Sequence, residues 1–207
     1  MPRIDLNVPF HEKDEAKALG ARWDPQRRLW YVPDNIDASS LRKWIPVSQS
    51  PNVRAASCFL AEATRGCWRC SCQTRVFGIV LPAGHETLYV DDDPAGDYWE
   101  VVDEPTMLSY ITFLADPIPA SLRNLAPLYR INYSQTTHSF YWMNHCDRCG
   151  IKLGDFDTIE EFGAALNPST PEEAAMVQIR AVSEPLFASC GSNTSGLELF
   201  GYMRRCR

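Results

Sequence analysis

The sequence has no apolar run of the roughly 18 residues that a membrane-spanning helix needs. Residues 1–5 are polar and lack the apolar segment of a signal peptide. We therefore expect a cytoplasmic protein with no membrane partner. In that compartment the eight cysteines are expected to be reduced or bound to metal rather than paired in disulfides.

Motifs of catalysis are also missing. None of the four histidines lies in a His-Glu-x-x-His motif, and the chain has neither a Gly-x-Ser-x-Gly nor a Walker sequence. A zinc deaminase needs His-x-Glu before its cysteines, whereas Glu86 directly follows His85. A zinc-dependent hydrolase would need an open metal position. We therefore expect a protein without enzymatic activity.

Residues 76–122 contain no Lys or Arg but nine acidic residues. Such a stretch predicts a negative surface that repels phosphates and attracts a basic protein, so we expect nucleic acid to bind only through residues 1–46. Two alternatives are an ordinary solvated acidic loop and a calcium-binding loop over residues 91–97. These residues lack the regular alternation of ligands found in an EF-hand loop. The predicted partner-binding residues are Glu86, Asp91, Asp92, Asp93, Asp97, Trp99, Glu100, Asp103 and Glu104.

Two Cys-x-x-Cys pairs are present, Cys67 with Cys70 and Cys146 with Cys149. Four thiolates suit a tetrahedral zinc ion with bonds of about 2.3 Å, and such a shell leaves no position for substrate. The sequence therefore predicts one structural zinc ion. The pairs are further apart than the roughly 15–20 residues of the common four-cysteine pattern, so a zinc ribbon here would carry a large insertion.

Other interpretations of the cysteines stay open at this point. One pair could be a redox dithiol, although such motifs usually lie near a βαβ pattern. Cys72 is a candidate substitute ligand because it lies two residues after Cys70. His145 is expected to pack or to support the site rather than to bind the ion beside its neighbour Cys146. The cysteines expected to be plain thiols are Cys58, Cys190 and Cys206.

Residues 1–46 have the pattern of a small αβ unit. The expected elements are a strand over 4–8, a helix over 11–19 that ends at Gly20, a strand over 28–32, and a short helix over 37–44 capped by Asp37. The strings LNVPF, AKALGARWD and WYVP resemble a small domain of unknown function that occurs on plasmid-type primases and other bacterial proteins that handle DNA. The resemblance implies a recognition or docking module.

This module combines cations with aromatic rings, which leaves two interpretations. The rings could stack bases while the cations neutralise phosphates. Alternatively, the rings form the core of a very small domain and the charges solvate its outside. The residues concerned are Lys13, Lys17, Arg22, Arg27 and Arg28 beside Trp23, Trp30 and Tyr31.

The remainder of the chain predicts a second domain over residues 55–207, after a polar linker over 47–57. The expected strands cover residues 75–81, 87–90, 98–102, 129–133, 139–143 and 197–200, and residues 108–114 fit a helix or a strand. Two late helices are expected, one with a capping box of Thr158 and Glu161 and one starting at Thr170. The predicted fold class is α+β, a small αβ module plus a larger antiparallel-sheet domain with zinc knuckles and late helices.

The string YWMNHCDRCGIKLGDFD, with a Cys-Trp-x-Cys knuckle upstream, resembles zinc-ribbon segments of uncharacterised bacterial proteins. Two functions follow as hypotheses. The first is a non-enzymatic binding protein whose acidic surface docks a basic partner, for instance an immunity or inhibitor protein that neutralises a nuclease toxin. The second is an accessory protein of DNA transactions that uses the N-terminal module.

Overall fold

The structure is a computed structural model that describes residues 4–33, 36, 38–45, 50–90, 96–194 and 198–206. The chain divides into two compact units. The first unit holds residues 1–48 together with 132–140, and the second holds residues 49–131 and 141–207. The two units are described separately below.

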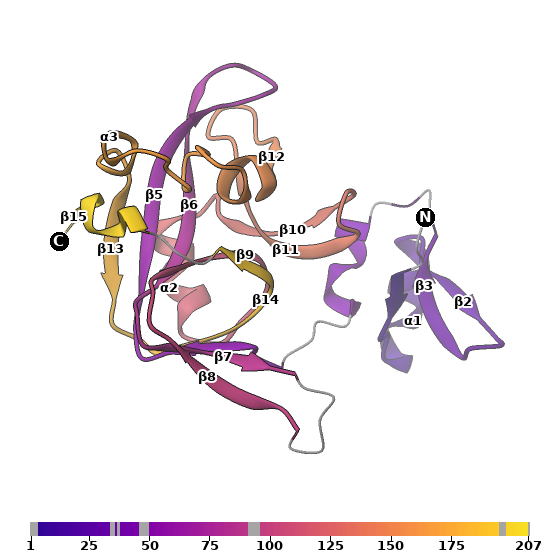
Figure 1. The fold of residues 1–207 in the computed structure, drawn as a ribbon. Coiled ribbons are helices and arrows are strands. Elements are labelled where there is room, and N and C mark those ends of the chain that lie inside the picture. The colour runs from indigo at the N-terminus through magenta and orange to yellow at the C-terminus, as the bar shows by residue number, and fades with distance from the viewer. Residues whose placement is uncertain are drawn as a thin grey trace. The chain divides into compact units, whose positions relative to one another are not determined.

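The N-terminal residues form a three-stranded antiparallel sheet in the order β1-β3-β2, with one α-helix (Figure 1). The elements are β1 (Ile4–Leu6), a 3-10 helix (Phe10–Glu12), α1 (Lys13–Ala18), β2 (Arg22–Asp24), β3 (Leu29–Val32) and a 3-10 helix (Ala38–Trp44). The two predicted strands and the first helix are confirmed. Strand β2 was not predicted from the sequence, and Asp37, the predicted cap, lies outside the described residues.

The core of this small sheet is built from aliphatic side chains and a single tryptophan. Leu6, Val32, Leu41 and Trp44 are all buried. Gly20 follows α1 with a φ of +99°, a conformation that favours glycine, and a Cβ there would lie 3.0 Å from Ile36. The core therefore does not depend on Trp23, which is 48% exposed.

The second unit contains a nine-stranded sheet in the order β15-β13-β5-β6-β9-β14-β4-β7-β8. Its neighbours pair antiparallel, except that β13 and β15 run parallel. The strands of this sheet are β4 (Val53–Ala55), β5 (Cys58–Gly66), β6 (Gln73–Leu81), β7 (His85–Tyr89), β8 (Tyr98–Val102), β9 (Thr106–Leu114), β13 (Gln178–Val182), β14 (Leu186–Thr194) and β15 (Arg204–Cys206). A second sheet joins β10 (Arg130–Ser134), β11 (Ser139–His145) and β12 (Lys152–Leu153).

The inner strand β6 is buried on both faces from Val76 to Leu81, which explains the continuous apolar run there. Phe77, Ile79 and Leu81 point into one cluster, where α2 (Ile118–Leu125) and Trp142 of β11 pack. The alternate residues point into a second cluster that contains Val76, Val80 and the metal-site cysteines Cys67 and Cys146. The sheet is therefore covered on both sides, and the mixed α+β class with mainly antiparallel strands is confirmed.

Several local predictions need correction. Thr158 does not cap a helix, because it lies inside a π-helix over Phe156–Glu160 and the backbone is extended at Glu161; its hydroxyl donates to the Gly154 carbonyl at 2.8 Å. Residues 198–202 form a 3-10 helix (Glu198–Tyr202) instead of a strand. The predicted linker contains β4, which pairs with β14 and β7. The helix α3 (Pro171–Ala174) is confirmed, with the Thr170 hydroxyl accepting from the Glu173 N–H at 3.2 Å.

Residues 108–114, for which the sequence fitted either a helix or a strand, lie in strand β9. At its centre Tyr110 has a φ of +47°, which is strained for a residue with a side chain. It lies beside Gly191 of β14, close to the point where the β9–β14 register shifts between Ser189 and Cys190. The Tyr110 N–H donates to Oδ2 of the buried Asp155 at 2.7 Å. In the described part of the chain, no helix is both long and apolar enough to cross a membrane.

Candidate metal centre

The two Cys-x-x-Cys pairs occupy equivalent hairpin turns. The first turn joins β5 to β6, and the second joins β11 to β12. In the first, the Cys67 N–H donates to the Cys72 carbonyl (2.8 Å) and the Ser71 N–H to the Cys67 carbonyl (2.9 Å). In the second, the Cys146 N–H donates to the Ile151 carbonyl (2.9 Å) and the Gly150 N–H donates to the Cys146 carbonyl (3.0 Å).

Each turn also contains one residue in the left-handed region four positions after its first cysteine. These residues are Ser71 (φ +57°) and Gly150 (φ +68°). Glycine adopts this conformation readily, so Gly150 is a visible sequence signal of the second turn. Ser71 gives no such signal. Both turns bend the chain so that the cysteine sulfurs face a common point.

The four predicted cysteines come together at that point. The sulfurs of Cys67, Cys70, Cys146 and Cys149 all lie within 4.8 Å of one another. The Cys67–Cys149 and Cys70–Cys146 sulfur distances are both 3.7 Å. A tetrahedral shell with bonds of about 2.3 Å separates its sulfurs by roughly 3.8 Å, whereas a disulfide needs about 2.05 Å. The residues present therefore fit a metal ion and not a pair of disulfides.

Backbone N–H groups favour the thiolate forms of Cys146 and Cys70. The N–H groups of Cys149 and Arg148 lower the pKa of the Cys146 thiol to about 5, and the latter donates to its sulfur at 3.4 Å. The N–H of Cys72 likewise lowers the pKa of Cys70. Cys67 and Cys146 are buried, and Cys149 is exposed. The cluster thus sits at the edge of the second core, with one corner toward solvent.

Side chains of the second hairpin fasten it to β6. Asn144 donates to the Phe77 carbonyl (2.8 Å) and accepts from the Phe77 N–H (2.7 Å). The Asp147 N–H donates to the Thr74 hydroxyl at 2.8 Å, and the Asp147 carboxylate accepts from the Arg75 N–H at 3.1 Å. These contacts bring the two turns together although they are far apart in the sequence.

A fifth sulfur lies beside the cluster. The Cys72 sulfur lies 3.2 Å from the Cys70 sulfur and 3.4 Å from the Cys146 sulfur. Cys72 therefore remains a candidate substitute ligand. His145 is buried, its Nδ1 lies 2.9 Å from the Leu128 carbonyl, and it is not part of the four-sulfur cluster. Burial raises the pKa of Cys58 to about 12 and that of Cys190 to about 11, which suits plain core thiols.

The predicted acidic surface is only partly available. Glu86 accepts two hydrogen bonds of 2.7 Å from Arg54 of β4, and the same guanidinium lies 4.3 Å from the ring of Trp99. Asp91, Asp92 and Asp93 lie outside the described residues. The exposed acidic residues on and beside the edge strand β8 are Asp97, Glu100, Asp103 and Glu104.

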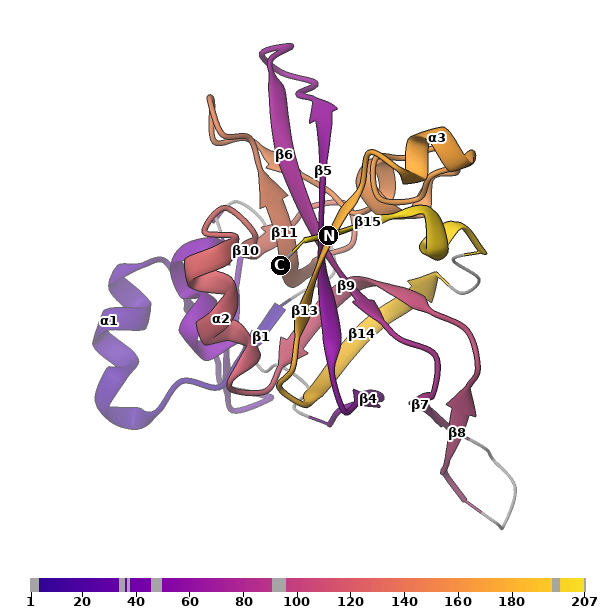
Figure 2. The ribbon, with the colours of Figure 1, turned by 90° about the vertical axis from the view of Figure 1, so that its left-hand side faces the viewer.

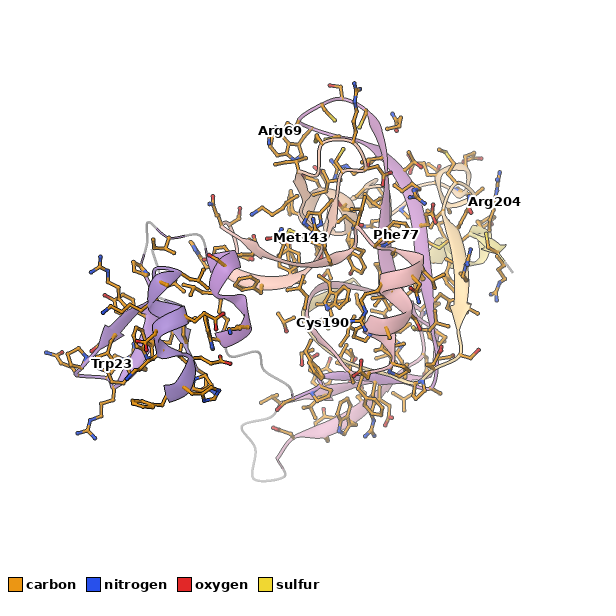
Figure 3. All side chains as sticks on the ribbon, turned by 180° about the vertical axis from the view of Figure 1, so that it is seen from behind. Trp23, Arg69, Phe77, Met143, Cys190 and Arg204 are labelled. Carbon is orange, nitrogen blue, oxygen red and sulfur yellow. The ribbon has the colours of Figure 1, made fainter. Side chains whose placement is uncertain are left out.

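The N-terminal module carries a groove of about 450 Å³. Trp23 and Trp30 are cross-strand partners on β2 and β3, with ring centroids 5.7 Å apart (Figure 3). The described lining residues include two cations and no carboxylate. They are Lys17, Gly20, Ala21, Arg22, Trp23 and Trp30. Arg27 and Lys43 instead pair with acidic neighbours, at 3.0 Å from Asp5 and 2.7 Å from Glu15.

Comparison with known proteins identifies this module. Residues 3–46 match the family described as a domain of unknown function, DUF5710. Two Escherichia coli proteins named DNA primase TraC are similar, one 64% identical over 53 residues and the other 46% identical over 61 residues. These matches cover 26% and 30% of this chain but only 5% and 4% of the primases. No solved structure matches the chain.

Proposed function

We propose that the protein is a non-enzymatic accessory protein of DNA transactions, which binds single-stranded nucleic acid through the groove of its N-terminal module. The observation that carries the proposal is the half-exposed Trp23 in a groove lined by Lys17 and Arg22. Bases stack on exposed aromatic rings, and cations along the groove neutralise the backbone. The similarity of this module to part of two DNA primases supports the same partner class.

The metal centre has a structural role in this proposal. We propose zinc as the ion, because an all-cysteine tetrahedral set is typical of structural zinc. Four sulfurs close the shell and leave no position for a substrate. The ion would hold the β5–β6 and β11–β12 turns together and would not itself contact a substrate.

Replacing Trp23 tests the groove. In the full chain, Trp23→Ala should weaken binding to labelled oligo-dT by about 5- to 160-fold, the equivalent of the ~1–3 kcal/mol that a stacked base contributes. Fluorescence anisotropy at low salt measures the affinity. Phe10→Ala is the matched control, because Phe10 is an 82% exposed aromatic of the same module outside the groove. Equal affinities for all three proteins would remove the groove from the proposal.

A second candidate function is docking of a basic protein on the β7–β8 hairpin, including inhibition of a basic toxin. One observation favours it. Tyr89 and Tyr98 stack at 5.8 Å and are each about half exposed. Half-exposed tyrosines beside acidic residues suit an interface with a cationic partner.

Charge reversal tests this candidate. Replacing Asp97, Glu100 and Asp103 with lysine should abolish capture of a basic protein from lysate of the source cells. The same number of reversals at the exposed Asp157, Glu161 and Glu172 is the control. Mass spectrometry of the captured proteins reads out the result. If the hairpin variant retains every partner that the control retains, this docking site is excluded.

A further inference from the structure

We propose that the tip of the metal centre is a second contact surface for single-stranded nucleic acid, formed by the two knuckle turns. Figure 2 shows these turns at one end of the second unit. This inference extends the proposed function to a different part of the chain. It stands on its own contacts and does not require the groove around Trp23.

Exposed residues of both turns supply an aromatic ring and cations at this tip. Trp68 is 63% exposed, and its indole N–H donates to the Lys152 carbonyl of the opposite turn at 3.2 Å. Arg69 and Arg148 are exposed, one on each turn; Figure 3 labels Arg69. Within the described part of the chain, neither guanidinium has an ion pair. The tip thus offers a base-stacking face flanked by cations.

The local charge at this tip is opposite to that of the unit as a whole. Residues 63–75 hold three arginines and no acidic residue, and residues 146–152 hold Arg148, Lys152 and the acidic Asp147. The Asp147 carboxylate lies 3.6 Å from the Arg75 guanidinium. The count of charged residues along the sequence predicted that this part of the chain repels phosphates. That count combined the basic residues of the two turns with the acidic stretch of 76–122. The fold separates the two regions, because Glu86 and Glu100 lie on β7 and β8, which Figure 2 shows away from the β5–β6 turn.

A simpler role for these cations is to balance the metal centre. A divalent ion with four thiolates carries a formal charge of −2, which nearby cations would offset. Arg75 is the ion-pair partner of two carboxylates, Asp147 at 3.6 Å and Glu62 at 4.0 Å. Five cations against these two carboxylates leave +3, which exceeds the −2 of the centre by one, so a positive field remains at the tip. Charge balance also gives no reason for an exposed tryptophan. Both observations favour a polyanion with accessible bases over neutralisation alone.

Hydrogen bonds within the two turns and to a neighbouring segment hold this surface in a fixed conformation. Arg65 donates to the Asp157 carbonyl at 2.7 Å and to the Thr158 hydroxyl at 3.1 Å, which fixes the strand that leads into the first turn. The knuckle hydrogen bonds hold the turns themselves. A rigid platform loses little conformational entropy when a strand binds.

The test uses the full metal-loaded chain, labelled oligo-dT of 20 nucleotides and a salt series. Arg69→Glu with Arg148→Glu should weaken binding and lower the slope of log affinity against log salt by about 1.4, because each lost phosphate contact removes roughly 0.7. Trp68→Ala should weaken binding by about 5-fold or more. Metal content, measured on each variant, must equal that of the wild type, which separates a lost contact from a damaged knuckle.

The matched control reverses two exposed arginines of the same unit on β13 and β15, Arg180→Glu with Arg204→Glu. Figure 3 labels Arg204 away from Arg69. An equal loss in this control would overturn the tip surface, since net charge alone would explain the effect. So would an unchanged affinity in the tip variants. A loss at the tip with none in Trp23→Ala would instead overturn the groove and leave the tip standing.

Discussion

Cys146→Ala is expected to remove the metal ion and to unfold the end of the second unit that carries the knuckles. Cys146 is buried, and its sulfur lies within 4 Å of the sulfurs of both Cys70 and Cys72. Apparent binding energies of structural zinc are about 10–16 kcal/mol, as large as the whole stability of a typical domain. We expect metal content to fall from one equivalent to none, with a large drop in melting temperature.

Two control variants make this experiment specific. Cys206→Ser changes a half-buried thiol whose nearest polar partner is Gln178, so metal content should stay at one equivalent. Cys72→Ser should also retain the ion if the four predicted ligands form the shell. Loss of metal in Cys72→Ser would make Cys72 a ligand. A metal-free, reduced wild-type protein that is fully folded would refute the structural role of the centre.

Asp155→Asn is expected to change the pH dependence of stability strongly. Burial raises the pKa of Asp155 to about 7 from its ordinary 3.8. Below pH 4 the carboxyl is protonated in both the folded and the unfolded chain. Between pH 4 and 7 only the unfolded chain loses the proton, so stability falls by ~1.4 kcal/mol per pH unit and levels off above pH 7, a loss of roughly 4 kcal/mol.

The substitution should remove that loss. An asparagine can still accept the hydrogen bond from Tyr110 N–H, but it cannot ionise. The stability of D155N relative to wild type should therefore rise by roughly 2–3 kcal/mol from pH 5 to pH 8, as measured by urea unfolding of the metal-loaded protein. Asp157→Asn, at an exposed site nearby, should give a profile parallel to wild type. A parallel profile for D155N would contradict the buried-carboxyl interpretation.

Local features of the sequence were sufficient for some elements. Thr170 and Pro171 specify a helix start through their own backbone and side-chain chemistry, and that helix is present. Thr158 and Glu161 have the same spacing but start no helix, because Thr158 already lies inside the π-helix Phe156–Glu160 and the backbone is extended at Glu161. The Thr158 hydroxyl donates to the Gly154 carbonyl and accepts from Arg65. Whether a short polar motif acts as a cap depends on the backbone conformation that the surrounding fold imposes on it. A motif of this kind cannot be resolved by spacing alone.

Which acidic residues are available to bind a partner also depends on the tertiary structure. Glu86 reads as a free acid in the sequence, but Arg54 lies directly opposite it in the β4–β7 pairing. The strand that carries Arg54 was predicted as a linker, since its three residues are too few for a periodic signal. Only the sheet register shows that this carboxylate is already paired.

The sequence by itself determined the identity of the four cysteines, the N-terminal module and the mixed fold class, because spacing, specific strings and alternation are local properties of a chain. The tertiary structure decided which cysteine sulfurs meet, which tryptophan is exposed, and where opposite charges separate. Those outcomes depend on strand pairing between residues far apart in the sequence, and on burial, which no local pattern encodes.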